Sequence, residues 1–311
     1  MTPETIHDRE KKFAEKLTDS SGKTFTAGNP IDIGDGFTIR PISPGFKTYF
    51  YQTKTEKTQI CLHFTVGVIT GDIASLTKEN NHMSVPYVVD RCGNIYRLFD
   101  ESFWSYHLGS SAIGGNAVMS KQSIGIEISN YGPLKEKDGK FIDAYGNTYT
   151  SKAEQVDSVS YRGYNYYAKM TDVQKHALAH LLKYLSEKHG IPLNFKEYTG
   201  EVFTSPEEAV AYRGVFCHSN VRKDKFDLPP EFTLQIQDAL NEFLCGNEEP
   251  VRAPEPEHVE ESVKETPQDE PTELVDTEAD TTGPDEEQVP PTFWERVVAW
   301  LSSIFNRQRQ S

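Results

Sequence analysis

The chain has 311 residues, 36% of them hydrophobic, and a formal net charge of −15, so it holds enough apolar material for a buried core. Sixteen acidic residues against two basic ones lie between positions 248 and 290, which leaves the first 247 residues close to neutral. Neither part concentrates Lys and Arg as a nucleic-acid-binding domain does, and the composition argues against that class of function.

The cysteines and the N-terminal sequence indicate the cellular compartment in which the protein is made. Four cysteines, at 61, 92, 217 and 245, are too few and too scattered for a disulfide framework and indicate reduced thiols. The first 20 residues lack the apolar core of a signal peptide, and no stretch reaches the roughly 18 apolar residues of a membrane span. We therefore expect cytoplasmic synthesis without a signal peptide.

Three segments show the period-two alternation of strands, at 59–65, 85–90 and 123–129. In the first, the apolar side chains share one face and His63 stands on the other. In the third, three isoleucines stand opposite Glu127. A carboxylate on such a strand is costly to bury unless something uses it. We therefore expect these strands to offer one functional group each to a shared cleft.

The segment 134–170 is rich in tyrosine, with turn signals at 138–139 and 146–147. Aromatic rings of this kind line grooves that bind sugars or peptides, because they combine flat apolar faces with polar tips. Packing within an inserted hairpin explains the same composition equally well, and both alternatives stay open.

Two helices are expected in the second half. One follows Thr171, whose spacing to Gln174 suits a capping box, and the other spans 232–244. Strands mixed with helices indicate an α/β fold, a single mixed sheet flanked by helices. His176 and His180 lie four residues apart on the first helix but away from its leucine stripe, so we expect both on the solvated surface.

A third source of functional groups follows, at 216–230. His218 and Asp227 are near enough in the chain for one loop to bring both onto a metal held by His63. Two imidazoles and one carboxylate leave an open position on tetrahedral zinc, as in catalytic sites, and a water there is activated as a nucleophile. Cys61 shares a face with His63, and we interpret it as a small buried residue.

These motifs together resemble the zinc-dependent N-acetylmuramoyl-L-alanine amidases, a family that includes phage lysozyme-type amidases, muropeptide amidases and peptidoglycan recognition proteins. The resemblance runs from about Lys57 to Phe232. Several ordered motifs are more specific than any single one. Those that carry it here are 62–65, 85–96, 104–109, 123–127 and 218–230.

The resemblance implies roles for individual residues. His63, His218 and Asp227 match the zinc ligands. Glu127 matches the general base, Lys225 the lysine that stabilises the oxyanion, and Tyr87 a tyrosine near the metal. Substrate contacts are expected from the residues Trp104, His107 and Asn116.

Three positions need comment. Phe64 replaces a histidine that often follows the first ligand, and alternation points its ring into the core. The stretch 228–230 replaces the usual Pro-Gly-Pro, which leaves the shape of that loop open. His107 matches a cleft-lining histidine that contacts substrate or a metal-binding side chain and does not itself bind the metal. Such a contact in the cleft and a place in an ordinary surface loop are equal alternatives.

Composition divides the chain into an N-terminal extension (1–45), the zinc amidase domain (46–246), an acidic linker (247–290) and a C-terminal segment (291–311). The linker has few large apolar residues and is expected to be a disordered tether. Residues 292–309 predict a short amphipathic helix with two tryptophans. It suits a membrane surface or a protein partner, and docking back onto its own domain is the alternative.

The sequence thus predicts an enzyme that cleaves the bond between N-acetylmuramic acid and L-alanine in peptidoglycan, with zinc as its cofactor. An endolysin-like lytic role, acting on the wall after release, is the favoured interpretation. A cytoplasmic amidase that recycles muropeptides and a non-catalytic peptidoglycan-binding module are the two rivals. The stem-peptide specificity and the oligomeric state do not follow from the sequence.

Overall fold

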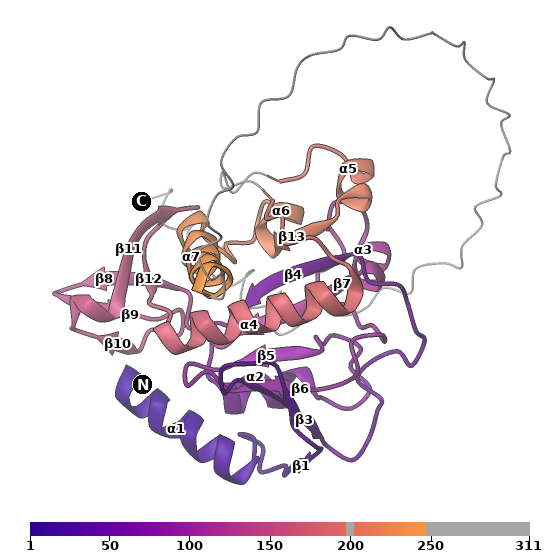
Figure 1. The fold of residues 1–311 in the computed structure, drawn as a ribbon. Helices are drawn as coiled ribbons and strands as arrows, with labels where there is room; N and C mark the ends of the chain where they lie inside the picture. The colour runs from indigo at the N-terminus through magenta and orange to yellow at the C-terminus, as the bar shows by residue number, and fades with distance from the viewer. Residues whose placement is uncertain (197–201, 247–311) are drawn as a thin grey trace, which may run out of the picture. The chain divides into compact units, whose positions relative to one another are not determined.

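The computed structural model describes residues 1–196 and 202–246 (Figure 1). The linker predicted at 247–290 and the helix predicted in 291–311 lie outside these residues, and both stay predictions. Among the helices of the described part, none has the length and apolar character needed to cross a bilayer.

A mixed sheet of eight strands forms the centre of the domain (Figure 1). Four neighbouring strands, β13, β4, β7 and β5, are parallel, while β6 is antiparallel to β5. The mixed α/β fold expected from the sequence is confirmed. In spatial order the strands are β1 (Thr26–Ala27), β3 (Thr38–Ser43), β6 (Ile95–Arg97), β5 (Tyr87–Val89), β7 (Ser123–Ile128), β4 (Gln59–Phe64) and β13 (Gly214–Cys217), with β2 (Ile31–Asp32) beside β3.

Helices cover both faces of this sheet. They are α1 (Pro3–Lys16), α2 (Ile69–Leu76), α3 (Asn116–Gln122), α4 (Asp172–His189), α5 (Pro206–Ala211), α6 (His218–Val221) and α7 (Pro230–Gly246). One face carries α4, which crosses in front of the strands in Figure 1 and packs against α7. On the other face, Cys61 is buried with residues of α3, α5 and α6, and Val88 is buried with residues of α1 and α2. The odd-numbered side chains of β4 therefore lie on the face of Cys61, and the even-numbered ones lie on the face of α4.

A second, antiparallel sheet is inserted between β7 and α4. Its strands, in spatial order, are β10 (Thr148–Thr150), β9 (Lys140–Ile142), β8 (Pro133–Lys137), β12 (Tyr164–Ala168) and β11 (Val156–Tyr161), with the short 3-10 helix η1 (Ala153–Gln155) before β11. Tyr149 and Tyr167 are buried in it, which favours the packing interpretation for these two tyrosines, whereas Tyr145 is exposed.

The helix expected after Thr171 is confirmed as α4. The Thr171 hydroxyl accepts a hydrogen bond from the Gln174 amide at 3.2 Å, and Gly190 ends the helix in the left-handed conformation. The surface position predicted for His180 is wrong. Its ring is 4% exposed and packs against Phe37 and Phe243. The leucine stripe marks only the side of α4 that faces the sheet, while α7 covers a second side.

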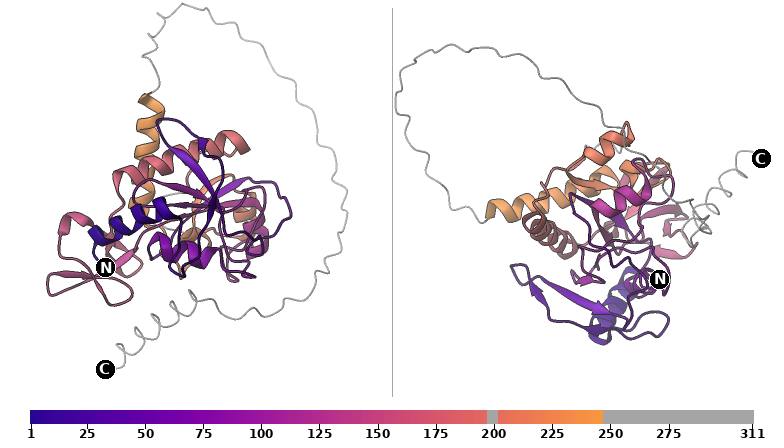
Figure 2. Two further views of the ribbon diagram at one scale, coloured as in Figure 1. Left: turned by 90° about the horizontal axis from the view of Figure 1, so that it is seen from below. Right: turned by 90° about the vertical axis from the view of Figure 1, so that its right-hand side faces the viewer.

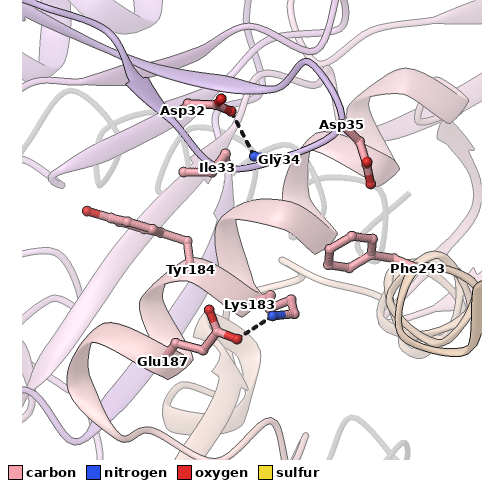
Figure 3. A pocket seen from close by; sticks show the side chains of 8 residues that line it. All are labelled: Asp32, Ile33, Gly34, Asp35, Lys183, Tyr184, Glu187 and Phe243. Atoms are coloured by element: carbon pink, nitrogen blue, oxygen red, sulfur yellow. Dashed lines mark hydrogen bonds and ion pairs between the residues drawn. The ribbon is translucent and has the colours of Figure 1, made fainter. Parts of the chain in front are cut away.

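A pocket is lined in part by Asp35 and Phe243 (Figure 3), and both of these residues contact the buried His180. Charged groups of both signs rim it, and Lys183 pairs there with Glu187 on α4. The lining residues are Asp32, Ile33, Gly34, Asp35, Lys183, Tyr184, Glu187 and Phe243. None of the site residues predicted from the sequence lines it.

Residues 1–45 are built into the domain. They supply β1, β2 and β3 to the main sheet, and α1 packs beside α2 (Figure 2). On α1, Glu10 is fully buried and forms an ion pair with Arg91, whose backbone amide also donates to Glu10 Oε2 at 2.9 Å. Arg91 in turn donates to the Gly67 carbonyl at 2.9 Å. The pair therefore ties α1 to the loop that follows β5.

Replacing Glu10 by glutamine is expected to lower the free energy of unfolding by about 2 kcal/mol, because a charged hydrogen bond is lost while Arg91 stays buried. Urea denaturation of the full chain, followed by circular dichroism, measures this change. Glu4→Gln is the matched control, since Glu4 lies on the same helix and pairs with Lys152 in solvent. Equal effects of the two substitutions would contradict the anchoring role of Glu10.

Candidate active site

Three predicted ligands meet at the carboxyl ends of two neighbouring parallel strands. His63 lies near the end of β4, and His218 directly follows β13, whose Cys217 is in register with Leu62. His63 Nδ1 lies 3.0 Å from His218 Nδ1 and 3.5 Å from Asp227 Oδ2. His218 Nδ1 lies 3.1 Å from the same carboxylate oxygen. All three side chains are buried, so the three atoms surround one point inside the domain.

This donor set fits zinc. Ligand atoms about 2.0–2.1 Å from a tetrahedral zinc ion stand about 3.3 Å apart, close to the separations found here. His218 Nε2 lies 2.9 Å from the Leu108 carbonyl, to which only an N–H can donate, so its Nδ1 offers a lone pair. Burial lowers the pKa of His218 to about 4, which keeps the ring neutral at neutral pH.

Glu127 stands beside this group on β7, where it is in register with His63. Burial raises the pKa of Glu127 well above its usual value, the Asp227 carboxylate adds to that effect, and the Lys225 ammonium opposes it. The residue is partly accessible, yet its Oε2 is buried and has no hydrogen-bond partner within residues 1–196 and 202–246. A carboxyl group in this setting is suited to accept and release a proton.

Lys225 and Asp227 belong to a loop that the second sheet supports. Arg162, in the turn between β11 and β12, donates to the carbonyl oxygens of Ser219 at 2.9 Å, Arg222 at 2.8 Å and Lys223 at 3.1 Å, and also to that of Lys225. One planar guanidinium thus holds several carbonyl groups of the loop. No pattern in the sequence singled out Arg162.

Aromatic rings add to this support. The Phe226 ring lies 5.9 Å from that of Phe64 and 5.5 Å from that of Tyr164, measured between centroids. Phe64 is buried, as its position in the strand predicted. The side chain that replaces a common histidine therefore helps to hold the loop of Asp227 instead of approaching the ligands.

Tyr87 lies on the opposite face of the sheet from the predicted metal ligands. In β5, Val88 is in register with Glu127, whereas Tyr87 is in register with Ile126 and leaves the opposite face of the sheet. Its hydroxyl donates to Glu101 Oε2 at 2.8 Å, and Glu101 pairs with Lys188 of α4. The prediction that Tyr87 lies near the metal is wrong, because the strand register turns its side chain towards α4.

The residues expected to contact substrate are held by neighbouring groups. Trp104 is 8% exposed and stacks on Tyr51, with ring centroids 4.2 Å apart. Asn116 Oδ1 accepts hydrogen bonds from the Leu108 backbone amide and from Ser120 Oγ. These bonds fix the loop of Leu108, whose carbonyl oxygen lies against His218 Nε2. His107 lies against His63. The substrate contacts themselves stay predictions.

Cys61 forms a second close group with His63 and His107, their potential ligand atoms lying within 4.8 Å. Burial raises the pKa of the Cys61 thiol well above its usual value. A thiol must lose its proton to bind zinc, so this group is less suited to the metal than the one that includes Asp227. The position agrees with a small buried residue.

The sequence profile of N-acetylmuramoyl-L-alanine amidases matches residues 53–227. The chain belongs to this family. The match includes His63, Glu127, His218 and Asp227, and it confirms the family indicated by the sequence motifs. A comparison with curated proteins finds no match.

Several solved structures of such amidases are similar to this family member. LysC from Clostridium intestinale URNW is 14% identical, with 65% of this chain and 97% of that chain covered and a TM-score of 0.37. AmiD from E. coli, in complex with anhydro-N-acetylmuramic acid-L-Ala-D-gamma-Glu-L-Lys, is 19% identical, with coverages of 68% and 65% and a TM-score of 0.37. AmpDh3 from Pseudomonas aeruginosa, in complex with an anhydromuramic pentapeptide, is 18% identical, with coverages of 63% and 64% and a TM-score of 0.36.

Replacing Arg162 by alanine is expected to weaken zinc binding about 10-fold, the range in which loss of an outer partner of a metal site falls. The reason is that the loop of Asp227 loses its contacts to the second sheet. Competition with a coloured chelator measures the affinity. Arg213→Ala is the control, because Arg213 also donates to three carbonyl groups but at the end of α5. Equal zinc affinities in the two variants would refute the supporting role of Arg162.

Proposed function

We propose that this amidase hydrolyses the bond between the lactyl group of N-acetylmuramic acid and the L-alanine of the stem peptide, with zinc held by His63, His218 and Asp227. The observation that carries the proposal is the convergence of three ligand atoms, 3.0–3.5 Å apart, beside Glu127. Among the described residues, Oε2 of Glu127 has no hydrogen-bond partner, and this supports the proposal, since such a buried carboxylate oxygen is costly unless water or substrate contacts it.

A bound zinc ion would polarise the substrate carbonyl and lower the pKa of a water molecule. Glu127 takes the proton from the attacking water and delivers it to the amine of L-alanine as the amide bond breaks. The ammonium of Lys225 offsets the negative charge that develops on the carbonyl oxygen. His218 stays neutral and keeps its proton on Nε2, facing the Leu108 carbonyl.

We further propose that the substrate is the intact wall. The support comes from the sequence, in which an acidic Pro-rich stretch at 247–290, predicted to be a tether, is followed by a segment at 292–309 that is predicted to be amphipathic. A tethered segment of this kind suits an enzyme that ranges from a membrane surface or a protein partner over a large insoluble substrate. A recycling enzyme for soluble fragments has no evident use for it.

The test compares purified sacculi with soluble muropeptides, and labels new amino termini of L-alanine after incubation with the full chain and zinc. Release from sacculi is the expected result. Turnover of soluble fragments alone would assign the chain to muropeptide recycling. Binding to sacculi without any release would make it a non-catalytic binding module and would refute the proposal.

A further inference from the structure

Both ring nitrogens of His107 are engaged within the protein. Its Nδ1 lies 3.0 Å from His63 Nε2, and its Nε2 lies 3.0 Å from Ser123 Oγ. We infer that His107 and Ser123 form a hydrogen-bond relay that fixes the tautomer of His63, so that His63 presents the lone pair of Nδ1 to the metal. This inference rests on the proposed function, because it takes His63 as a ligand of zinc.

The Met119 carbonyl sets the direction of the relay. Ser123 Oγ lies 2.6 Å from this oxygen, which can only accept, so the serine hydroxyl donates its single proton there. Ser123 Oγ is then an acceptor towards His107, and the proton of the neutral His107 ring belongs on Nε2. His107 Nδ1 therefore carries a lone pair and accepts from the N–H at His63 Nε2.

The consequence lies at the other nitrogen of His63. With the proton held on Nε2, Nδ1 of His63 faces His218 Nδ1 and Asp227 Oδ2 as a third lone pair. Three acceptor atoms that share one point repel one another unless a cation lies between them. The two histidines thus reach the same tautomer by different means, His218 through the Leu108 carbonyl and His63 through the relay.

The relay also decides between the two cleft roles expected for His107. A ring whose two nitrogens bond to His63 and Ser123 has no nitrogen left for a sugar or a peptide. His107 is therefore a positioning residue, which acts on the metal through His63, and not a contact for substrate. Outer partners of this type orient metal-bound histidines and raise their affinity for the metal.

The test measures zinc affinity of the full chain by competition with a coloured chelator, which needs no substrate. His107→Phe keeps a ring without nitrogens and is expected to weaken zinc binding about 10–100-fold, while Ser123→Ala weakens it about 10-fold. His107→Asn retains an acceptor oxygen near the position of Nδ1 and should restore most of the affinity. Ser105→Ala is the matched control, because Ser105 is equally buried and donates to a carbonyl, that of Tyr49, but to no histidine.

Nitrogen-15 NMR of the histidines in the zinc-loaded chain gives a second measurement, with His63 expected to carry its proton on Nε2. Zinc bound to Nε2 of His63 would overturn the inference. The inference would also be overturned if the His107→Phe and Ser123→Ala chains bound zinc as tightly as the Ser105→Ala chain and the His107→Phe chain differed only by a raised KM. If the native chain binds zinc and releases no L-alanine termini, the proposed function fails while the relay stays measurable.

Discussion

Glu127→Gln is expected to lower the rate of amide hydrolysis by about 10³-fold and to leave zinc bound, within the range attributed to a positioned general acid or base. Glutamine has nearly the same shape as glutamate but cannot take the proton of the attacking water. The ligand atoms of His63, His218 and Asp227 are unchanged by the substitution. Release of new L-alanine amino termini from sacculi, together with the zinc content of the purified chain, measures both quantities.

Glu101→Gln provides the control for this experiment. Glu101 is also a buried carboxylate, but it accepts from Tyr87 and pairs with Lys188 on the face of the sheet away from the ligands. Its replacement is expected to lower stability and to leave the rate per folded molecule unchanged. Full activity of the Glu127→Gln chain would remove the proton-transfer role, and loss of its zinc would make Glu127 a ligand instead.

The parts of the fold that follow from local patterns were predictable. Alternation in 59–65 and 123–129 placed His63 and Glu127 on the polar side of two strands, and the structure puts these strands side by side in register. The capping pattern of Thr171 and Gln174 located the start of α4. Such signals are encoded within a few residues, so they can be read without knowledge of the rest of the chain.

Features that depend on tertiary contacts were not predictable in this way. The register of β5 decides the face from which Tyr87 leaves, and nothing within 85–90 specifies it. Burial of His180 depends on the packing of α7 against α4. Arg162 reaches a loop about 60 residues further along the chain, and a single arginine in a hairpin turn is no signal of such a role.

Removal of zinc, or of the carboxylate proposed to bind it, is expected to have the second large effect. Asp227→Ala should lower zinc affinity by more than about 100-fold, beyond the loss attributed to outer partners of a metal site. Hydrolysis should fall with it, because two imidazoles alone leave the site short of a ligand and of a negative charge. Treatment of the native chain with a chelator should abolish activity, and added zinc should restore it.

The matched control for Asp227 lies in the same loop. Asp224 is exposed and pairs with Arg222, three positions before the ligand. Asp224→Ala removes the same charge from the loop without touching the three convergent atoms, so zinc affinity should stay near the native value. Similar losses in both variants would mean that loop charge, and not coordination, governs zinc binding. Native affinity in Asp227→Ala would show that this carboxylate, which lies 3.1 Å from His218 Nδ1, does not bind the metal, and would overturn its assigned role.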